Sequence, residues 1–213
     1  MTLEDFLEHT RKQVLRDINV PPLWSDDVRV RYANEGLAKI AERTHFLVDD
    51  SNYTVDLEAG EPRYELADDV KLVHSAKLKG YIGYLATCTE SRIPNIDTNS
   101  RPAAFTCDAA TGTLHFFPTP DTSYEAVLRV TRLPKKLKLN DTNAEIELPE
   151  EWCLILADWV GYRCFAEDDA DGRNDQAADR CQARFYQGLK DIKAAVYRLK
   201  MGNASQARGK RVK

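Results

Sequence analysis

The stretch NDQAADRCQARFYQGLKDIKAAVYRLKM, residues 174–201, decides the fold. Apolar residues recur in it at spacings of three and four, which places them on one stripe of a helix: Ala178, Cys181, Phe185, Leu189, Ile192, Val196 and Leu199. At 1.5 Å per residue this helix is roughly 40 Å long. Because a stripe of that length must be buried, the sequence predicts partner helices elsewhere in the chain.

Three further helices are expected, and they come from both ends of the sequence. One begins after Pro149, which suits a first helical turn, and has apolar residues along one side. Another begins at Ser25 and runs to about residue 48, and the first begins at Thr2, a candidate cap, and stops before Pro21. Residues 1–50 and 148–201 are therefore predicted to form a four-helix bundle.

Between these ends, in residues 51–147, the apolar period changes from three and four to two, which is typical of strands. The expected elements are a hairpin over residues 53–66, strands over 70–78 and 81–87, a long loop over 90–102, a hairpin over 104–117, a strand over 124–133 and a short edge strand over 136–139. The predicted fold class is α+β, with this antiparallel β region inserted between the second and third helices of the bundle.

Composition excludes several classes of protein. Of the 213 residues 43% are hydrophobic and 30% are charged, and no apolar run approaches the ~20 residues that would cross a bilayer. The first residues, MTLEDFLEH, are acidic where a signal peptide would be basic, so we expect no membrane contact and a cytosol-like compartment. Five cysteines without a CxxC pair indicate free thiols.

The last twelve residues, GNASQARGKRVK, form a basic tail. Arg208, Lys210, Arg211 and Lys213 lie there without any acidic residue, although the chain as a whole has a net charge of -4. Since residues 202–213 contain almost nothing apolar to bury, we expect a flexible tail that orders on a partner. A plainly solvated terminus is the alternative.

A second basic cluster consists of Arg132, Lys135, Lys136 and Lys138. Lysines on an edge strand commonly prevent unwanted strand pairing, and this interpretation is favoured. A secondary interface is the alternative, and a nucleic-acid interface is disfavoured by a sequence pI near 5.7.

No pattern of catalytic or metal-ligating residues is found. The four histidines form no ligand pair, no phosphate-binding or nucleophile motif occurs, and no cofactor or metal is expected. The acidic run from Glu167 to Gly172 imitates the start of a calcium loop, but Ala178 stands where a closing glutamate is required, so a solvated turn is favoured. Trp152 and Trp159 share a helix face and are interpreted as core. A hydrolase using Glu150 or Glu151 is the weakest alternative, and the sequence predicts no enzyme.

Four segments together carry a resemblance to a known family. They are NEGLAKIAERT (34–44), EPRYELADDVKLV (61–73), TLHFFPTPDTSYEAVLRVTRLPKKL (113–137) and PEEWCLILADWV (149–160). In this order they resemble the head-to-tail connector adaptors, or neck proteins, of tailed bacteriophages. The resemblance covers roughly residues 20–200 and contains no catalytic signature.

The resemblance implies a structural virion protein, assembled in the host cytoplasm, that forms a homo-oligomeric ring of about twelve copies under the portal protein. Such a ring joins the capsid to a further neck or tail protein, and DNA passes through its lumen without sequence-specific binding, during genome ejection as well. Arg208, Lys210, Arg211 and Lys213 would contact an acidic portal surface. A stopper or tail-completion protein of the next neck layer, and a soluble nucleic-acid-associated module that uses the basic tail, remain alternatives.

Overall fold

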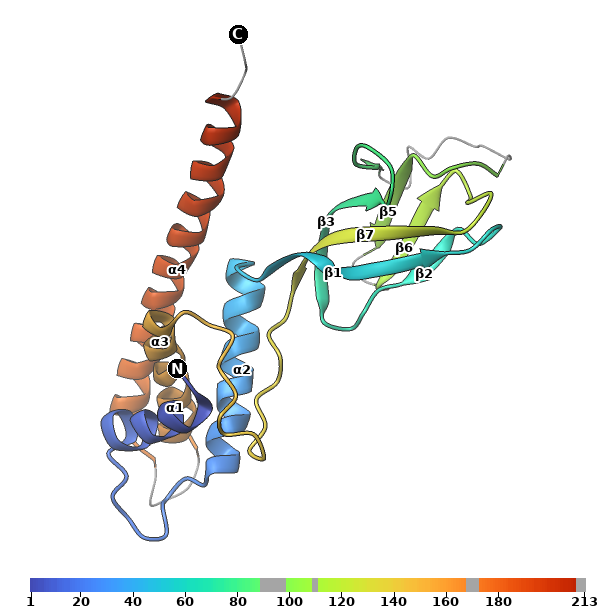
Figure 1. Ribbon diagram of the computed structural model, residues 1–213. Coiled ribbons are helices and arrows are strands. Elements are labelled where there is room, and N and C mark those ends of the chain that lie inside the picture. Colours follow the sequence, from blue (N-terminus) through green and yellow to red (C-terminus); the bar gives the residue numbers. More distant parts are fainter. Residues whose placement is uncertain (89–98, 109–110, 168–172, 210–213) are drawn as a thin grey trace. The chain divides into compact units, whose positions relative to one another are not determined.

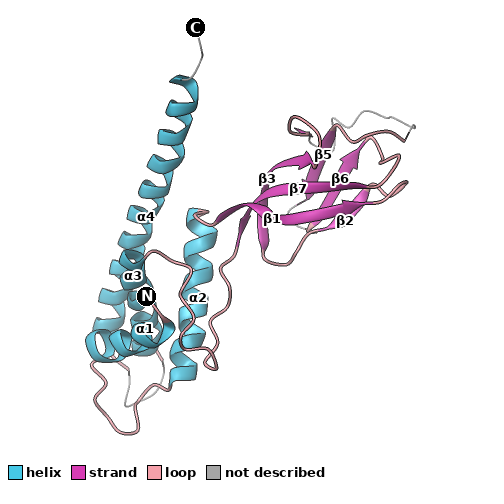
Figure 2. Ribbon diagram, viewed as in Figure 1, coloured by secondary structure: helices cyan, strands magenta, loops and turns pink. Residues whose placement is uncertain are grey.

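The computed structural model describes residues 1–88, 99–108, 111–167 and 173–209, with side chains up to residue 200 (Figure 1). The chain divides into two compact units. A helical unit contains residues 1–44 and 134–213, and a β unit contains residues 45–133. Figure 2 shows the helices in the two terminal parts of the chain and the strands between them, which confirms the α+β class.

The helical unit contains α1 (Leu3–His9), a π-helical turn η1 (Thr10–Leu15), α2 (Asp26–Thr44), α3 (Glu150–Phe165) and α4 (Asp175–Gly209). Helix α4 packs on α3, and α2 contacts both of them. Helix α1 has only seven residues and contacts α2 and α3. The prediction of helices from both ends is confirmed, but the described residues do not show the four-helix bundle that we expected, because the first helix is too short to line the others.

The apolar stripe of α4 is largely buried up to Val196, as its spacing predicts, but its last member, Leu199, is exposed. Phe185 and Ile192 are almost completely buried, and Phe185 packs against the Trp159 ring of α3 with the ring centroids 4.8 Å apart. Gly188 permits the close approach of the two helices, because a Cβ atom there would lie 2.7 Å from Ile155 Cγ1. The interpretation of Trp159 as a core residue is therefore confirmed.

The start of the chain is fixed by capping and by pairing with a distant segment. The Thr2 hydroxyl accepts a hydrogen bond from the Asp5 amide, and the Asp5 carboxylate accepts one from the Thr2 amide, which satisfies the first turn of α1. The Leu3 amide donates to the Ala144 carbonyl at 3.0 Å. Beyond η1, the buried Asp17 carboxylate accepts the Leu23 amide at 2.7 Å, so the loop before α2 is also tied down.

The described residues of the β unit form seven strands in two sheets. The strands are β1 (Val48–Leu57), β2 (Arg63–Glu65), β3 (Val70–Leu78), β4 (Ala86–Thr87), β5 (Ala104–Asp108), β6 (Thr113–Phe117) and β7 (Tyr124–Arg132). One sheet has the order β1-β7-β3 and the other β2-β6-β5-β4. Alternate residues of these strands meet in one core, which includes Phe105, Phe116 and Leu128.

Strand pairing differs from the sequence prediction in three places. The hairpin over residues 53–66 is wrong, since β1 pairs with β7 and β2 pairs with β6. Of the strand expected over residues 81–87 only β4 forms, and it is parallel to β5. No strand occurs over residues 136–139, whereas the hairpin of β5 and β6 is confirmed. Strands β1 and β7 have ten and nine residues. By pairing with β7, β1 therefore makes more cross-strand contacts than it could make with β2, which has three residues.

Candidate interaction surfaces

The C-terminal part of α4 exposes large apolar and aromatic side chains. Tyr197 is 62% exposed and Leu199 is 67% exposed, although both follow buried turns of the same helix. Figure 1 shows the end of α4 extending past α2 and α3. The sequence placed the end of this helix at Met201, but α4 continues to Gly209. Arg208 therefore lies within the helix, and Lys210, Arg211 and Lys213 lie outside the described residues.

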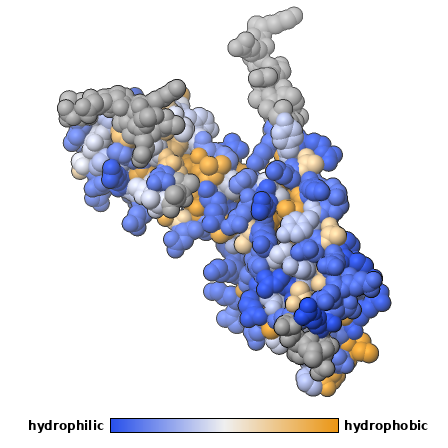
Figure 3. Space-filling model, turned by 180° about the vertical axis from the view of Figure 1, so that it is seen from behind, coloured by the Kyte–Doolittle hydropathy of each residue, from blue (hydrophilic) through white to orange (hydrophobic). Residues whose placement is uncertain are grey.

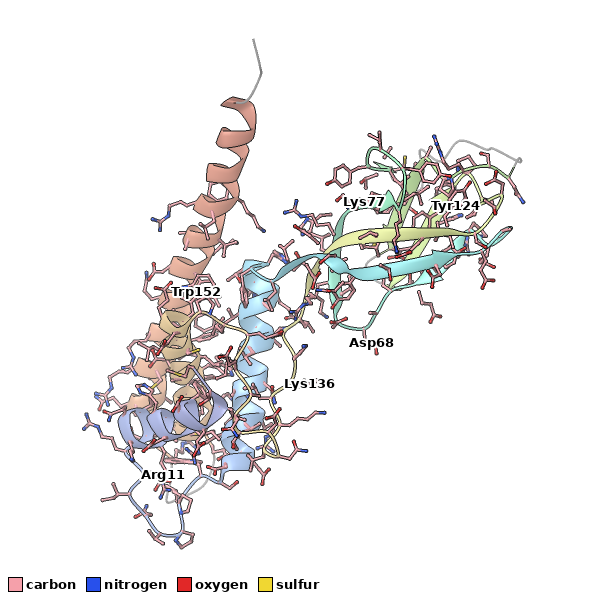
Figure 4. The ribbon with its side chains drawn as sticks, viewed as in Figure 1. Arg11, Asp68, Lys77, Tyr124, Lys136 and Trp152 are labelled. Carbon is pink, nitrogen blue, oxygen red and sulfur yellow. The ribbon has the colours of Figure 1, made fainter. Side chains whose placement is uncertain are left out.

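The second basic cluster does not form the edge strand that we expected. Arg132 ends β7, which is the central strand of its sheet, and its Nε lies 3.9 Å from the Asp49 carboxylate. The three lysines follow in an irregular segment of the helical unit, where Figure 4 labels Lys136. Asn34 of α2 holds this segment by bonding both the amide and the carbonyl of Leu137, at 2.8 Å and 3.0 Å. The segment is thus fixed by α2 and not by a sheet, and the lysine side chains are exposed.

A cavity of about 600 Å³ in the helical unit is lined by residues of η1, the end of α3 and the first turns of α4. Three arginines line it, Arg16, Arg180 and Arg184, and no carboxylate among the described residues does. Arg184 is paired with Asp158 of α3 at 2.5 Å. We name this site the arginine cavity. Its lining attracts anions, because two of its three guanidinium groups have no carboxylate within ion-pair distance in the described part of the chain.

Cys181 also lines the arginine cavity, and its surroundings make it unreactive. Burial raises the pKa of the Cys181 thiol, while Arg184, 3.3 Å from the sulfur, acts in the opposite direction. Because burial is the larger influence, the neutral thiol predominates near neutral pH. The described lining of the cavity therefore offers positive charge for binding and a neutral thiol.

A second cavity, of about 630 Å³, lies between the N-terminal turns and α2, and two ion pairs form among its lining residues. The almost fully buried Arg29 pairs with Asp26 and donates to the Leu7 carbonyl. Lys12 pairs with Glu8, and both line the same cavity. These groups pair with one another, although the buried Nε of Arg29 has no hydrogen-bond partner among the described residues, and we interpret this cavity as a structural feature of the helix packing.

The β unit carries a concentration of acidic residues. Residues 49–69 contain eight aspartates and glutamates and a single arginine. Four of the carboxylates are used internally. Asp49 accepts bonds from the turn at residues 51 and 52, Asp69 accepts the Tyr53 hydroxyl, Asp50 pairs with Arg129, and Glu61 accepts the Arg63 amide. Burial and this hydrogen bond raise the pKa of Tyr53 to about 12.

Four other carboxylates in this region are exposed and lack a cationic partner among the residues that the structure describes. They are Asp56, Glu58, Glu65 and Asp68. They lie on β1 and β2, each at the edge of its sheet, and in the turns beside them, where Figure 4 labels Asp68. We name this set the carboxylate edge. Asp56 is paired in register with Glu125, so negative charges face each other across β1 and β7.

The loop between β3 and β4 presents apolar side chains to solvent. Ile82 is fully exposed and Tyr84 is 71% exposed. Gly80 and Gly83, with φ of +83° and +105°, supply the left-handed conformations that the loop requires. The Tyr81 ring contacts Tyr124 and lies under the Arg101 guanidinium, so the base of the loop is held while its tip is free. Figure 3 shows apolar residues in small groups on a largely hydrophilic surface.

Other site predictions have simple outcomes. Within residues 1–88, 99–108, 111–167 and 173–209 no group of three histidine, cysteine, aspartate or glutamate side chains could hold a metal ion. Residues 168–172 of the predicted acidic turn lie outside the described residues. Glu150 and Glu151 are exposed in the first turn of α3 and line none of the cavities above. In the part of the chain that the structure describes, no helix has the length and apolarity to cross a bilayer.

The sequence analysis missed the arginine cavity, because Arg16 and Arg180 are far apart in the chain. Only the contact of η1 with α3, and of α3 with α4, brings them to one opening. A signal for one half existed, since Arg180 and Arg184 are four residues apart and share a helix face.

The chain is thus an α+β protein with helices from both chain ends, an inserted β unit and exposed apolar and charged surfaces. Comparison with known protein families matches residues 1–209 to the SU10 adaptor protein family. The chain belongs to this family, and it is a phage structural adaptor and a component of the virion. A comparison with curated proteins found no match.

Proposed function

We propose that this adaptor is a head-to-tail connector that forms a ring of about twelve copies beneath the portal protein. The ring joins the capsid to the next neck or tail protein and provides a passage for DNA. The match to an adaptor family over residues 1–209 carries this proposal, since it includes the β unit and every helix of the helical unit, α4 to its end at Gly209 among them.

The end of α4 is the proposed contact with the portal. Two observations support this assignment. Tyr197 and Leu199 are exposed on a helix whose preceding turns are buried, which leaves apolar area for a partner. The sequence then continues into Arg208, Lys210, Arg211 and Lys213, and these charges suit an acidic portal surface.

The proposed DNA passage agrees with the overall charge of the chain. A net charge of -4, with four of the basic residues in the tail, leaves a strongly acidic body. A lumen lined by carboxylates repels phosphates, so DNA can slide, whereas a basic lining would retain it by counterion release.

Electron microscopy of the portal protein of the same phage, mixed with this chain, tests the proposal. We expect added ring density below the portal, and loss of that density when residues 202–213 are deleted. A matched control replaces Lys190 and Lys193, which are exposed on α4 before its end, with glutamate and should bind normally. A portal without added density would refute the proposal. If this chain added density only to a portal already bound to another adaptor, it would instead be identified as a next-layer stopper.

Filter binding with DNA distinguishes a nucleic-acid-associated module from the connector function. Affinity for DNA that falls steeply with salt and disappears on deletion of residues 202–213 would favour that alternative. We expect weak binding that the deletion does not change. We also expect the free chain to be monomeric at low concentration, because the tail finds its contacts only on the portal, and mass photometry showing stable rings of free protein would contradict this.

A further inference from the structure

We propose that the arginine cavity of one copy binds the carboxylate edge of a second copy. The inference rests on the proposed ring, because it names the surfaces through which neighbouring copies meet. It assigns the two features that the portal contact leaves unused, one in the helical unit and one in the β unit.

The arginine cavity has the form and charge of a receptor for carboxylate side chains. At about 600 Å³ it can admit several side chains, and its lining includes apolar Val14 and Phe165 beside the arginines. Arg16 and Arg180 are exposed and carry no ion pair within the described residues. A planar guanidinium binds a carboxylate through two parallel hydrogen bonds, so these two residues can each hold one acidic side chain.

The carboxylate edge supplies the complementary charge. Glu58 and Glu65 are exposed, and in the described part of the chain neither forms an ion pair, although Arg63 lies two residues from Glu65 on β2. Two cations of the β unit are committed to other carboxylates: Lys79 pairs with Glu125 at 2.6 Å, and Arg129 pairs with Asp50 at 2.9 Å. Among the described residues, the carboxylate edge of the β unit and Arg16 and Arg180 of the helical unit therefore lack ion-pair partners.

A second copy is the occupant that satisfies both surfaces at once. Each copy carries one arginine cavity and one carboxylate edge. When the cavity of each copy binds the edge of the next, an open row of copies has a free cavity at one end and a free edge at the other. This is a head-to-tail contact, which repeats from copy to copy and closes into a ring when the rotation permits. DNA would neutralise the cavity alone and would leave the carboxylate edge unpaired.

Paired charge reversals in the full chain test the contact. The cavity variant carries Arg16→Glu and Arg180→Glu, and the edge variant carries Glu58→Arg and Glu65→Arg. Arg184 is left unchanged because its pair with Asp158 belongs to the packing of α3 on α4. The control for the cavity variant, Arg43→Glu with Lys193→Glu, makes the same change in net charge at exposed positions outside the cavity. Circular dichroism confirms that each variant is folded.

Sedimentation velocity at high protein concentration and low ionic strength measures the association. We expect the wild-type chain to self-associate, with association lost as salt is added. Each reversal variant alone should associate at least about tenfold more weakly, since like charges then face each other. An equimolar mixture of the two variants should associate again. When the variants alternate along a row, each acidic cavity meets a basic edge and each basic cavity meets an acidic edge.

Failure of the mixture to recover, unchanged association of either variant, or no association of the wild type would each overturn the inference. An equal loss in the control would also overturn it, because net charge alone would then explain the effect. If the inference fails while the wild-type chain still adds a ring to the portal, the connector function stands and only the assignment of the neighbouring contact is lost.

Discussion

Gly188 offers the sharpest test of how α4 is attached to the helical unit. Replacement by alanine should raise helix stability by about 1 kcal/mol through intrinsic propensity alone. In this structure, however, the new Cβ would lie 2.7 Å, 2.8 Å and 2.8 Å from three side-chain atoms of Ile155. Since Ile155 is β-branched and held in one rotamer by α3, it cannot move aside, and overpacking costs about 1–3 kcal/mol. We expect Gly188→Ala to lower the free energy of unfolding by about 1 kcal/mol.

The effect of Gly188→Ala on the free energy of unfolding should change sign when Ile155 is shortened. Ile155→Ala removes all three atoms that the new Cβ would meet, so adding Gly188→Ala to that variant should stabilise it by about 1 kcal/mol. Urea denaturation followed by circular dichroism measures both steps. Ala183→Gly, at an exposed position of α4, calibrates the propensity and should cost about 1 kcal/mol. If Gly188→Ala stabilises the wild-type chain as much as the Ile155→Ala variant, the close approach of α3 and α4 is refuted.

Three further predictions follow from buried groups. Arg29→Met leaves the Leu7 carbonyl without its donor, so the free energy of unfolding should fall by about 1–3 kcal/mol. The control Arg31→Met, at an exposed position, should lower it by less than about 1 kcal/mol. Equal effects of the two substitutions in urea denaturation would contradict the buried contact. The pKa of Tyr53, raised to about 12, exceeds its unfolded value near 10, so the stability that Tyr53 contributes is complete below pH 10 and is lost as the pH approaches 12. Tyr53→Phe should remove one late step from the tyrosinate absorbance titration and flatten this loss, and an unchanged titration would show that Tyr53 ionises normally. Cys153, Cys164 and Cys181 are buried, and burial raises the pKa of Cys164 to about 12. An aromatic disulfide reagent should therefore label Cys88 and Cys107 first and the three buried cysteines only on unfolding. Rapid labelling of all five cysteines would refute the buried positions.

Local patterns were sufficient wherever one element provides its own signal. The three-and-four spacing from Ala178 to Val196 predicted the buried face of α4, and the cap at Thr2 predicted the start of α1. The resemblance in four segments indicated the adaptor class that the family comparison supports over residues 1–209. The spacing in α4 and the cap at Thr2 each lie in residues close together in the chain, where spacing and residue type already define the geometry.

Pairing between distant residues was decided only by the tertiary structure. The sequence joined residues 53–66 into a hairpin because a turn at Gly60 links them, yet β1 lies against β7, where a long register buries more side chains. Likewise, Lys136 and its neighbours lack a sheet because Asn34 of α2 holds the Leu137 backbone. The arginine cavity exists because packing brings Arg16 beside Arg180. A sequence specifies the propensity of each segment, but the choice among partners depends on the area and charge that all segments bury together.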